Sequence, residues 1–199
     1  MSTGGNQNGL APEPDFRLTN CQTSTRNDTG QNVQQVHLGD KEFRSALGAF
    51  ATGVTVISAV GPRGELLGNT VNSFTSVSLD PPLILWCMGR HALSLKSYLS
   101  TDHFAVNILS VDQQHLSTRF AKAGPDKWAE VPHELWSSGC PILQGAAAVF
   151  ECKTRHTYMG GDHVIFVGEV LNAAQNVDAV PLVFHRGKYR ELAHATTQT

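Results

Sequence analysis

Residues 146–173, AAAVFECKTRHTYMGGDHVIFVGEVLNA, contain two long runs of strand-forming residues on either side of a glycine-containing turn. Ala146–Tyr158 and His163–Ala173 are the two strand candidates, and Met159-Gly160-Gly161-Asp162 joins them. Because so short a connection can join only antiparallel neighbours, this stretch predicts a long β-hairpin.

On both sides of this hairpin the sequence predicts more strands than helices. The further strand candidates are Val54–Val60, Leu66–Ser78 with a bend at Gly68 or Asn72, Leu83–Cys87, Phe104–Leu109, Leu182–His185 and Lys188–Leu192. The helix candidates are a segment that starts at Lys41 with Asp40 as its N-cap, Leu93–Leu99 with Ser94 near its start, and Asp112–Ala121 with Asp112 as its N-cap. The connections are too short for a series of βαβ crossovers. The expected fold is mainly β with a few helices packed outside an antiparallel barrel.

The composition of the chain changes near residue 37. Residues 1–37 consist mostly of Gly, Asn, Gln, Thr and Ser, and so few apolar side chains cannot offset the entropy of ordering the segment. We expect residues 1–37 to form a disordered tail, or alternatively an arm that docks on a partner subunit. Residues 38–192 are expected to form one domain, followed by a C-terminal tail over 193–199.

Charge and cysteine content exclude several classes of protein. The chain of 199 residues has a formal net charge of -2, which argues against nucleic acid as its main partner. No apolar run approaches the length of a membrane span, about 18 residues, and the start MSTGGNQNGL does not resemble a secretory signal. The four cysteines form no CxxC pair. We therefore expect a cytoplasmic protein with reduced thiols.

The common catalytic motifs are missing from the sequence, because GxSxG, HExxH, GxxxxGK[ST] and GxGxxG do not occur. The nine histidines form no i, i+4 pair on a clear helix, so no metal site is expected. An enzyme with this sequence must take its chemistry from a bound cofactor or from a site assembled across the fold.

Residues 68–82, GNTVNSFTSVSLDPP, alternate small polar side chains with apolar ones before a Pro-Pro stop. A strand of this composition offers hydroxyls, an amide and backbone groups to a flat heteroaromatic ligand. The same composition also occurs in ordinary Ser/Thr-rich strands at the surface of a sheet. Spacing alone leaves both interpretations open.

Several blocks of sequence stand in a characteristic order. They are Phe43-Arg44, Phe50–Ile57, Thr70–Pro82, Phe104–Leu109, Phe120-Ala121 with Asp126–Trp128, Gly139–Pro141, and Gly161–His163 with Gly168–Val170. Together, from Phe43 to Leu192, they resemble the flavin reductase-like domain family, the NAD(P)H:flavin oxidoreductase components of two-component flavin-dependent monooxygenases. The resemblance implies an FMN-binding split β-barrel, a Greek-key-like antiparallel barrel, that forms a homodimer with flavin near the subunit interface.

The resemblance also implies the binding residues. Those expected to border the flavin ring and ribityl chain are Thr52, Gly53, Val54, Thr55, Thr70, Val71, Asn72 and Ser73, continued by Ser76, Val77 and Ser78. Arg90 and Ser94 are expected at the flavin phosphate, where a helix start near Ser94 would direct free N–H groups at an anion. Many relatives carry serines between these two positions, whereas this chain has His91-Ala92-Leu93. The alternative for Arg90 is a solvated surface charge.

Gly161-Asp162-His163 opens the last long strand. Strand alternation places His163 on the same face as Ile165 and Val167. By resemblance, His163 is the catalytic candidate beside the flavin ring, where the nicotinamide stacks, with Gly161 and Asp162 next to it and His156 as a weaker candidate. The alternative is a hairpin turn in which Asp162 bonds its own backbone and His163 packs.

The implied reaction is hydride transfer from NADH, or NADPH, to FAD or FMN, which supplies reduced flavin to a partner monooxygenase. The protein then contributes geometry and neutral hydrogen-bond donors. Two alternatives use the same barrel: an oxidase of pyridoxamine phosphate or another small molecule with tightly bound flavin, and a non-catalytic flavin-binding sensor.

Overall fold

The structure, a computed structural model, describes residues 39–124 and 126–192. Its helices are α1 (Asp40–Leu47), α2 (Leu95–Leu99) and α3 (Gln114–Ala121), with a 3₁₀ turn η1 (Val111–Gln113) before α3. Its strands are β1 (Thr52–Gly53), β2 (Thr55–Val60), β3 (Leu66–Val71), β4 (Thr75–Leu79), β5 (Pro82–Gly89), β6 (His103–Ile108), β7 (His133–Leu135), β8 (Pro141–Leu143), β9 (Ala148–Gly160), β10 (His163–Gln175), β11 (Val183–His185) and β12 (Lys188–Arg190). The tails expected at 1–37 and 193–199 lie outside the described residues. Among the described residues, no helix is long and apolar enough to cross a membrane.

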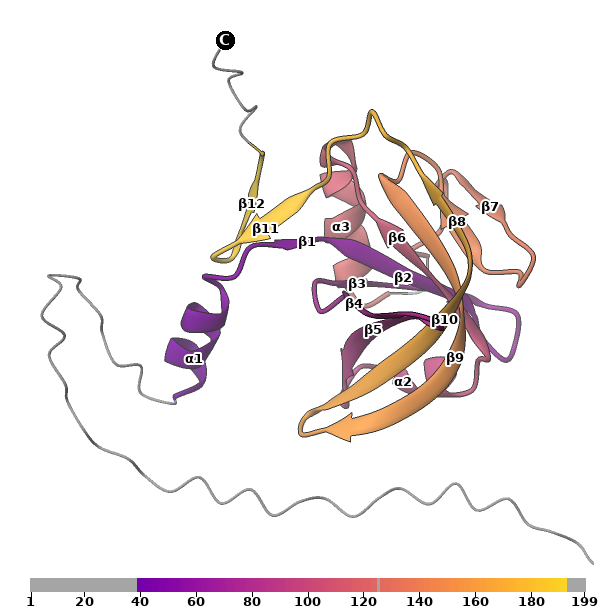
Figure 1. Cartoon of the computed structure of the whole chain (residues 1–199), viewed down its shortest axis with the longest axis horizontal. Coiled ribbons are helices and arrows are strands. Elements are labelled where there is room, and N and C mark those ends of the chain that lie inside the picture. The colour runs from indigo at the N-terminus through magenta and orange to yellow at the C-terminus, as the bar shows by residue number, and fades with distance from the viewer. Residues whose placement is uncertain (1–38, 125, 193–199) are drawn as a thin grey trace, which may run out of the picture. The chain divides into compact units, whose positions relative to one another are not determined.

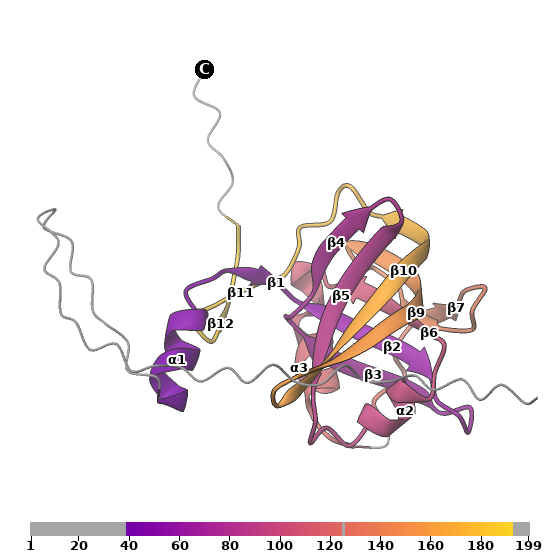
Figure 2. The same ribbon diagram turned by 60° about the horizontal axis from the view of Figure 1, so that its bottom comes forward.

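Seven strands form one antiparallel sheet in the order β3-β2-β6-β9-β10-β5-β4 (Figure 1). The predicted hairpin is confirmed, since β9 and β10 are antiparallel neighbours of 13 residues each. Figure 2 shows β4 beside β5, which in turn pairs with β10. Within the described residues, β3 and β4 end the order and do not pair with each other. The prediction of a mainly β, antiparallel fold with few helices is confirmed, while strand pairing leaves this sheet open.

The single strand expected over Leu66–Ser78 is wrong, because the chain leaves β3 after Val71 and starts β4 at Thr75. The break does include Asn72, one of the two positions at which a bend was expected. The two strands lie at opposite ends of the strand order, β3 against β2 and β4 against β5. Ser73 lies in the break, where its hydroxyl accepts the backbone N–H of Cys87 at 2.9 Å. Gly68 lies inside β3. Only glycine fits at this position, because a Cβ would overlap the ring of Phe120 on α3.

The starts of the helices also differ from the prediction. Before α3, Ser110 and Gln113 form a capping box, so Asp112 lies inside the 3₁₀ turn and is not the N-cap. The carbonyl of Gly39 accepts the N–H of Phe43 at 2.9 Å, so Gly39 rather than Asp40 caps α1. Helix α2 begins at Leu95, two residues after the expected start at Leu93, and Ser94 before it makes no side-chain capping hydrogen bond. The chain divides into two units, residues 1–46 and 47–199, and α1, which has no buried residue, lies in the first except for its last residue.

An aromatic cluster fills one face of the large sheet. Trp86 of β5 is fully buried and stacks on Phe166 of β10, with ring centroids 4.4 Å apart. Tyr98 of α2 and Phe104 of β6 meet the same indole edge-on. Such ring pairs contribute about 0.5–1.5 kcal/mol beyond their burial. Because Tyr98 also donates a 2.8 Å hydrogen bond to the carbonyl of Ile57, the cluster anchors α2 to the sheet.

Helix α3 covers the opposite face of β2 and β3. Leu116 and Phe120 of α3 pack there with Val56 and Trp128. Lys127 connects the end of this helix to the sheet, since its Nζ donates to the carbonyls of Gly68 at 3.0 Å and Phe120 at 3.1 Å. Partial burial lowers the pKa of Lys127.

Candidate functional site

The tip of the β9–β10 hairpin carries three of the predicted residues. Strand β9 ends at Gly160, β10 begins at His163, and Gly161 and Asp162 form the turn between them. Gly161 has a φ of 65°, which a residue with a side chain adopts only at a cost. His163 pairs with Gly160 on β9 and with Gly89 on β5, so a glycine lies beside it on each neighbouring strand.

The imidazole of His163 is held at one nitrogen. Its Nδ1 lies 2.7 Å from Oδ1 of Asp162, and the two side chains are 48% and 81% exposed. A Cβ on Gly89 would lie 3.8 Å from Nε2, so the ring leans over this glycine. Val164 and Phe166 point into the aromatic core, so His163 lies on the opposite, outward face.

Arg90 follows β5 and reaches the same turn. Its backbone N–H donates to the carbonyl of Asp162 at 2.8 Å. Its guanidinium Nη1 lies 3.5 Å from the carbonyl of Gly161, a weak contact by distance. Arg90 is exposed, so most of its guanidinium donors face solvent. The structure therefore brings Arg90, Gly161, Asp162 and His163 together.

Ser94 lies between β5 and α2 and is hydrogen-bonded to β3. Its Oγ donates a 2.9 Å hydrogen bond to Oδ1 of Asn69. The backbone N–H of Leu95, directly after it, donates to the carbonyl of Ala92 at 3.1 Å. Because α2 has only 5 residues and this first donor is already bonded, the expected set of free N–H groups at its start is smaller than the sequence suggests.

Several hydroxyls of the residues expected to border the flavin already form hydrogen bonds within the protein. Thr55 donates to the carbonyl of Val71 at 3.0 Å, and Thr70 donates to the carbonyl of Ser117 at 2.7 Å. Ser73 bonds both backbone groups of Cys87. Asn72 is exposed between β3 and β4. What this segment can offer a ligand is therefore the Asn72 amide and backbone groups, more than its hydroxyl protons.

Residues 52–54 precede β2, whose first residue Thr55 pairs with Val71 at the end of β3. Thr52 pairs with Phe184 and Gly53 with Val183 in a separate sheet of three strands, β1-β11-β12. Val54 is buried in the cluster under α3, so its side chain is a packing residue. The Oγ1 of Thr52 is buried and has no hydrogen-bond partner among the described residues. Such an orphaned hydroxyl is the kind of group that a polar ligand satisfies.

Ser76, Val77 and Ser78 lie on β4, the last strand of the sheet. A shift in the pairing with β5 falls between Ser76 and Ser78, which makes Val77 the bulged residue. Ser76 and Val77 are exposed and Ser78 is half-buried. One edge of this strand is unpaired within the described part of the chain.

His156 does not lie beside His163. It lies opposite Val167 on the outward face of β9, and the strand spacing of ~3.3 Å per residue puts it ~13 Å from the row of His163. Tyr158 lies between these two rows and is 53% exposed, with its ring centroid 5.9 Å from that of His156.

Sequence reasoning missed three residues that the structure places at this end of the sheet: Asn69, Gly89 and Tyr158. Two of them had a usable signal. Gly89 precedes Arg90 at the end of an apolar strand, and Tyr158 shares the alternation of His156. The pairing of Asn69 with Ser94 left no local signal, because it depends on how two distant segments meet.

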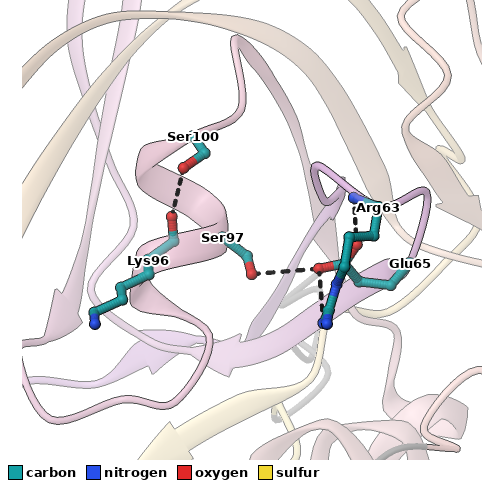
Figure 3. A network of polar contacts seen from close by, with 5 residues as sticks. All are labelled: Arg63, Glu65, Lys96, Ser97 and Ser100. Carbon is teal, nitrogen blue, oxygen red and sulfur yellow. Dashed lines mark hydrogen bonds and ion pairs between the residues drawn. The ribbon is translucent and has the colours of Figure 1, made fainter.

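A polar network holds α2 in place (Figure 3). Glu65 accepts the backbone N–H of Arg63 at 2.9 Å and the hydroxyl of Ser97 at 3.4 Å, and its carboxylate lies 3.7 Å from the Arg63 guanidinium. Hydrogen bonds from the backbone of Glu65 and Arg63 lower the pKa of Glu65. Ser100 closes the helix with a 2.9 Å bond to the carbonyl of Lys96. The Ser97–Glu65 bond therefore joins the middle of α2 to the segment before β3, while the Ser100 bond is local to the end of the helix.

A groove lies elsewhere, and it shares no residue with the predicted site. It is lined by Leu135, Trp136, Ser137, Asn172, Ala173 and Ala174. Beneath it Glu151 is fully buried and accepts hydrogen bonds from Ser137, Ser138 and Asn172. Burial by itself would raise the pKa of Glu151, but these hydrogen bonds outweigh it and lower the pKa to about 2. No group of three or more potential metal ligands occurs within residues 39–124 and 126–192.

The predicted residues fit a flavin and a nicotinamide in chemical type. His163 and Arg90 at the hairpin end offer an exposed imidazole and an exposed guanidinium. Asn72, between β3 and β4, offers an exposed amide, and Thr52 on β1 has a buried hydroxyl without a partner among the described residues. Neutral donors and acceptors beside a cation suit a heteroaromatic ring that carries a phosphate.

Comparison with known proteins identifies the family. Residues 47–193 match the model of the flavin reductase like domain. The chain is 45% identical over 149 residues to the FMN reductase (NADH) SmoA of Agrobacterium fabrum. The aligned residues cover 75% of this chain and 84% of that protein. The chain is 44% identical to the stachydrine N-demethylase reductase subunit Stc3 of Rhizobium meliloti, over 75% of this chain but only 64% of that one.

A solved structure shows the same fold. The Streptomyces globisporus NADH:FAD oxidoreductase SgcE6, in complex with NAD and FAD fragments, is 37% identical and superimposes with a TM-score of 0.78 over 82% of this chain and 99% of that chain. This likeness and the family match cover the large sheet and its helices. The chain therefore belongs to the flavin reductase like domain family.

Proposed function

We propose that this protein is an NADH-dependent flavin reductase that transfers a hydride from NADH to FAD or FMN. The observation that carries the proposal is the family match over residues 47–193, joined by relatives named for the reduction of FMN or FAD by NADH. We also propose that the reduced flavin serves a separate monooxygenase, because a relative 36% identical over 75% of this chain is named the reductase subunit of a flavin-dependent monooxygenase.

Flavin, when bound, would supply N5 as the acceptor of the hydride that leaves C4 of NADH. The hydride carries both electrons, and one proton from solvent would balance the charge and complete the dihydroflavin. This chain's residues then have to hold two flat rings in contact and orient them. No acid or base has to act on a covalent intermediate, which accords with the missing catalytic motifs.

We propose His163 as the residue at the nicotinamide, with the hairpin turn of Gly161 and Asp162 beside it. The flavin ring would border residues 52–55, 70–73 and 76–78, and Arg90 and Ser94 would lie toward the phosphate. The exposed Arg90 guanidinium and the orphaned Thr52 hydroxyl support this arrangement. The internal bonds of Thr55 and Thr70 mean that their contribution comes through the backbone.

We further propose that the large sheet is part of a split β-barrel and that two copies form a homodimer. Exposed apolar side chains on the outer strands support a second copy there, because Leu79 is 94% and Val77 49% exposed on β4. A cytoplasmic location belongs to the same proposal, and the free thiols of Cys87, Cys140 and Cys152 are in accord with it.

The test is the oxidation of NADH by purified protein, with FMN, FAD and riboflavin added in turn and NADPH as the parallel donor. Rapid oxidation that requires added flavin supports the proposal and identifies the preferred flavin and dinucleotide. A protein that keeps its flavin through desalting and oxidises NADH slowly contradicts it and indicates a tight-binding oxidase or a flavin sensor.

A further inference from the structure

The contact between Asp162 and His163 bears on which nitrogen of the neutral imidazole carries the proton. The Oδ1 of Asp162 lies 2.7 Å from Nδ1 of His163, within hydrogen-bond distance. An ionised carboxylate only accepts hydrogen bonds, so the ring nitrogen must be the donor. A neutral imidazole has one N–H, and here that proton belongs on Nδ1.

The other ring nitrogen is then an acceptor. Nε2 of His163 has no hydrogen-bond partner within residues 39–124 and 126–192. It lies over Gly89, where even a Cβ would stay 3.8 Å away. Because glycines pair with His163 on both neighbouring strands, no side chain from those positions covers this nitrogen.

The turn that carries Asp162 is itself held from β5. Arg90 donates its backbone N–H to the carbonyl of Asp162 at 2.8 Å, and its guanidinium contacts the carbonyl of Gly161. This backbone bond restrains the turn itself, so less backbone entropy is lost when the Asp162 side chain orients the ring. The turn residues Gly161 and Asp162 and the first residue of β10, His163, are thus held together with Arg90.

We propose that Asp162 is a positioning residue that keeps the proton on Nδ1, so that Nε2 of His163 accepts a hydrogen bond from the carboxamide N–H of NADH. This inference rests on the proposed function and deepens it. The carboxamide is the neutral N–H donor attached to the nicotinamide ring, so a lone pair on Nε2 would fix the rotation of that ring at the site of hydride transfer. The competing donor is the flavin N3–H.

The first test reads the tautomer without any ligand. In ¹⁵N-histidine-labelled protein, at a pH at which the ring is neutral, His163 shows the Nδ1–H tautomer, with His163→Gln to assign the signal. In Asp162→Asn the amide can donate as well as accept, so the signal shifts toward a mixture of tautomers. In Asp102→Asn, which changes an exposed carboxylate between α2 and β6, the signal stays unchanged. An Nε2–H tautomer in the unmodified protein overturns the proposal.

The second test removes the donor from the ligand. Reduced 3-acetylpyridine adenine dinucleotide has a methyl group in place of the amide NH₂, and its KM in the unmodified protein rises about three- to tenfold above that of NADH, the range of one neutral hydrogen bond. In Asp162→Asn the two dinucleotides have KM values within about twofold of each other, because the oriented acceptor is gone. The assignment is overturned if Asp162→Asn raises the KM of both dinucleotides equally. It is also overturned if KM rises only when N3-methylriboflavin replaces riboflavin, because the flavin N3–H is then the donor.

The experiments distinguish a failure of the proposed function from a failure of the role assigned to Asp162. A protein that does not oxidise NADH with any added flavin contradicts the proposed function, whatever the tautomer. A protein that oxidises NADH normally but whose preference for the carboxamide survives Asp162→Asn contradicts only the role of Asp162.

Discussion

Ser94, directly before α2, donates a 2.9 Å hydrogen bond to the side-chain carbonyl of Asn69 on β3, 25 residues earlier in the chain. The bond joins the loop after β5 to the edge strand at the other end of the strand order. It therefore holds the two segments expected to flank the flavin at a defined distance from each other.

Removal of this bond should affect flavin more than NADH. In Asn69→Ala the Ser94 hydroxyl loses its acceptor and the loop gains freedom, so we expect the KM for flavin to rise about three- to tenfold, the worth of one hydrogen bond. Ser94→Ala should behave alike, and the double variant should add little to either single change. Steady-state kinetics with each substrate varied in turn checks this, and fully additive effects would show that the two residues act independently.

His163 should matter for the dinucleotide. His163→Ala removes the ring over Gly89, and we expect the KM for NADH to rise more than the KM for flavin. His156→Ala is the matched control, because His156 lies on the same face but ~13 Å away along the strands. Unchanged NADH kinetics in His163→Ala would remove this residue from the nicotinamide site.

Gly68 should be intolerant of any side chain. A Cβ there overlaps the ring of Phe120 and lies 3.1 Å from Nε1 of Trp128. Overpacking of this kind costs about 1–3 kcal/mol, so Gly68→Ala should lower the denaturant midpoint markedly. Gly53→Ala is the control, since a Cβ at Gly53 meets nothing within 4 Å. Equal midpoints for the two variants would show that α3 can move away from β3.

Glu151 should make the fold sensitive to acid. Its pKa is lowered from 4.5 to about 2 in the folded protein, so the unfolded chain binds its proton first as the pH falls. The stability that Glu151 contributes is therefore complete above pH 4.5 and is lost progressively as the pH falls toward 2.

The measurement is the free energy of unfolding as a function of pH. Glu151→Gln should flatten the slope between pH 4.5 and 2, and should destabilise the protein at neutral pH because an amide cannot satisfy all the donors of Ser137, Ser138 and Asn172. The same slope in both proteins would assign the acid sensitivity to other carboxylates.

Much of the fold could be predicted from the sequence because its signals are local. The β9–β10 hairpin follows from two long runs of strand-forming residues around Gly160 and Gly161. The sequence also predicts α2 to within two residues of its start. The prediction failed over Leu66–Ser78, since one continuous alternation cannot reveal that its two halves pair with different strands. It failed again at Asp112, where the capping box of Ser110 and Gln113 takes precedence over a favourable N-cap residue.

By itself, then, the sequence determined the class of fold, the long hairpin and the residue types available for binding, because propensity, alternation and turn chemistry act between near neighbours. Tertiary structure alone decided which of those groups remain free. In the folded chain the hydroxyls of Thr55 and Thr70 donate to backbone carbonyls, and the hydroxyl of Ser94 donates to Asn69. Nε2 of His163 lies over Gly89 and remains available to a ligand. Hydrogen bonds between distant segments depend on strand order and register, and a linear pattern of residues carries neither.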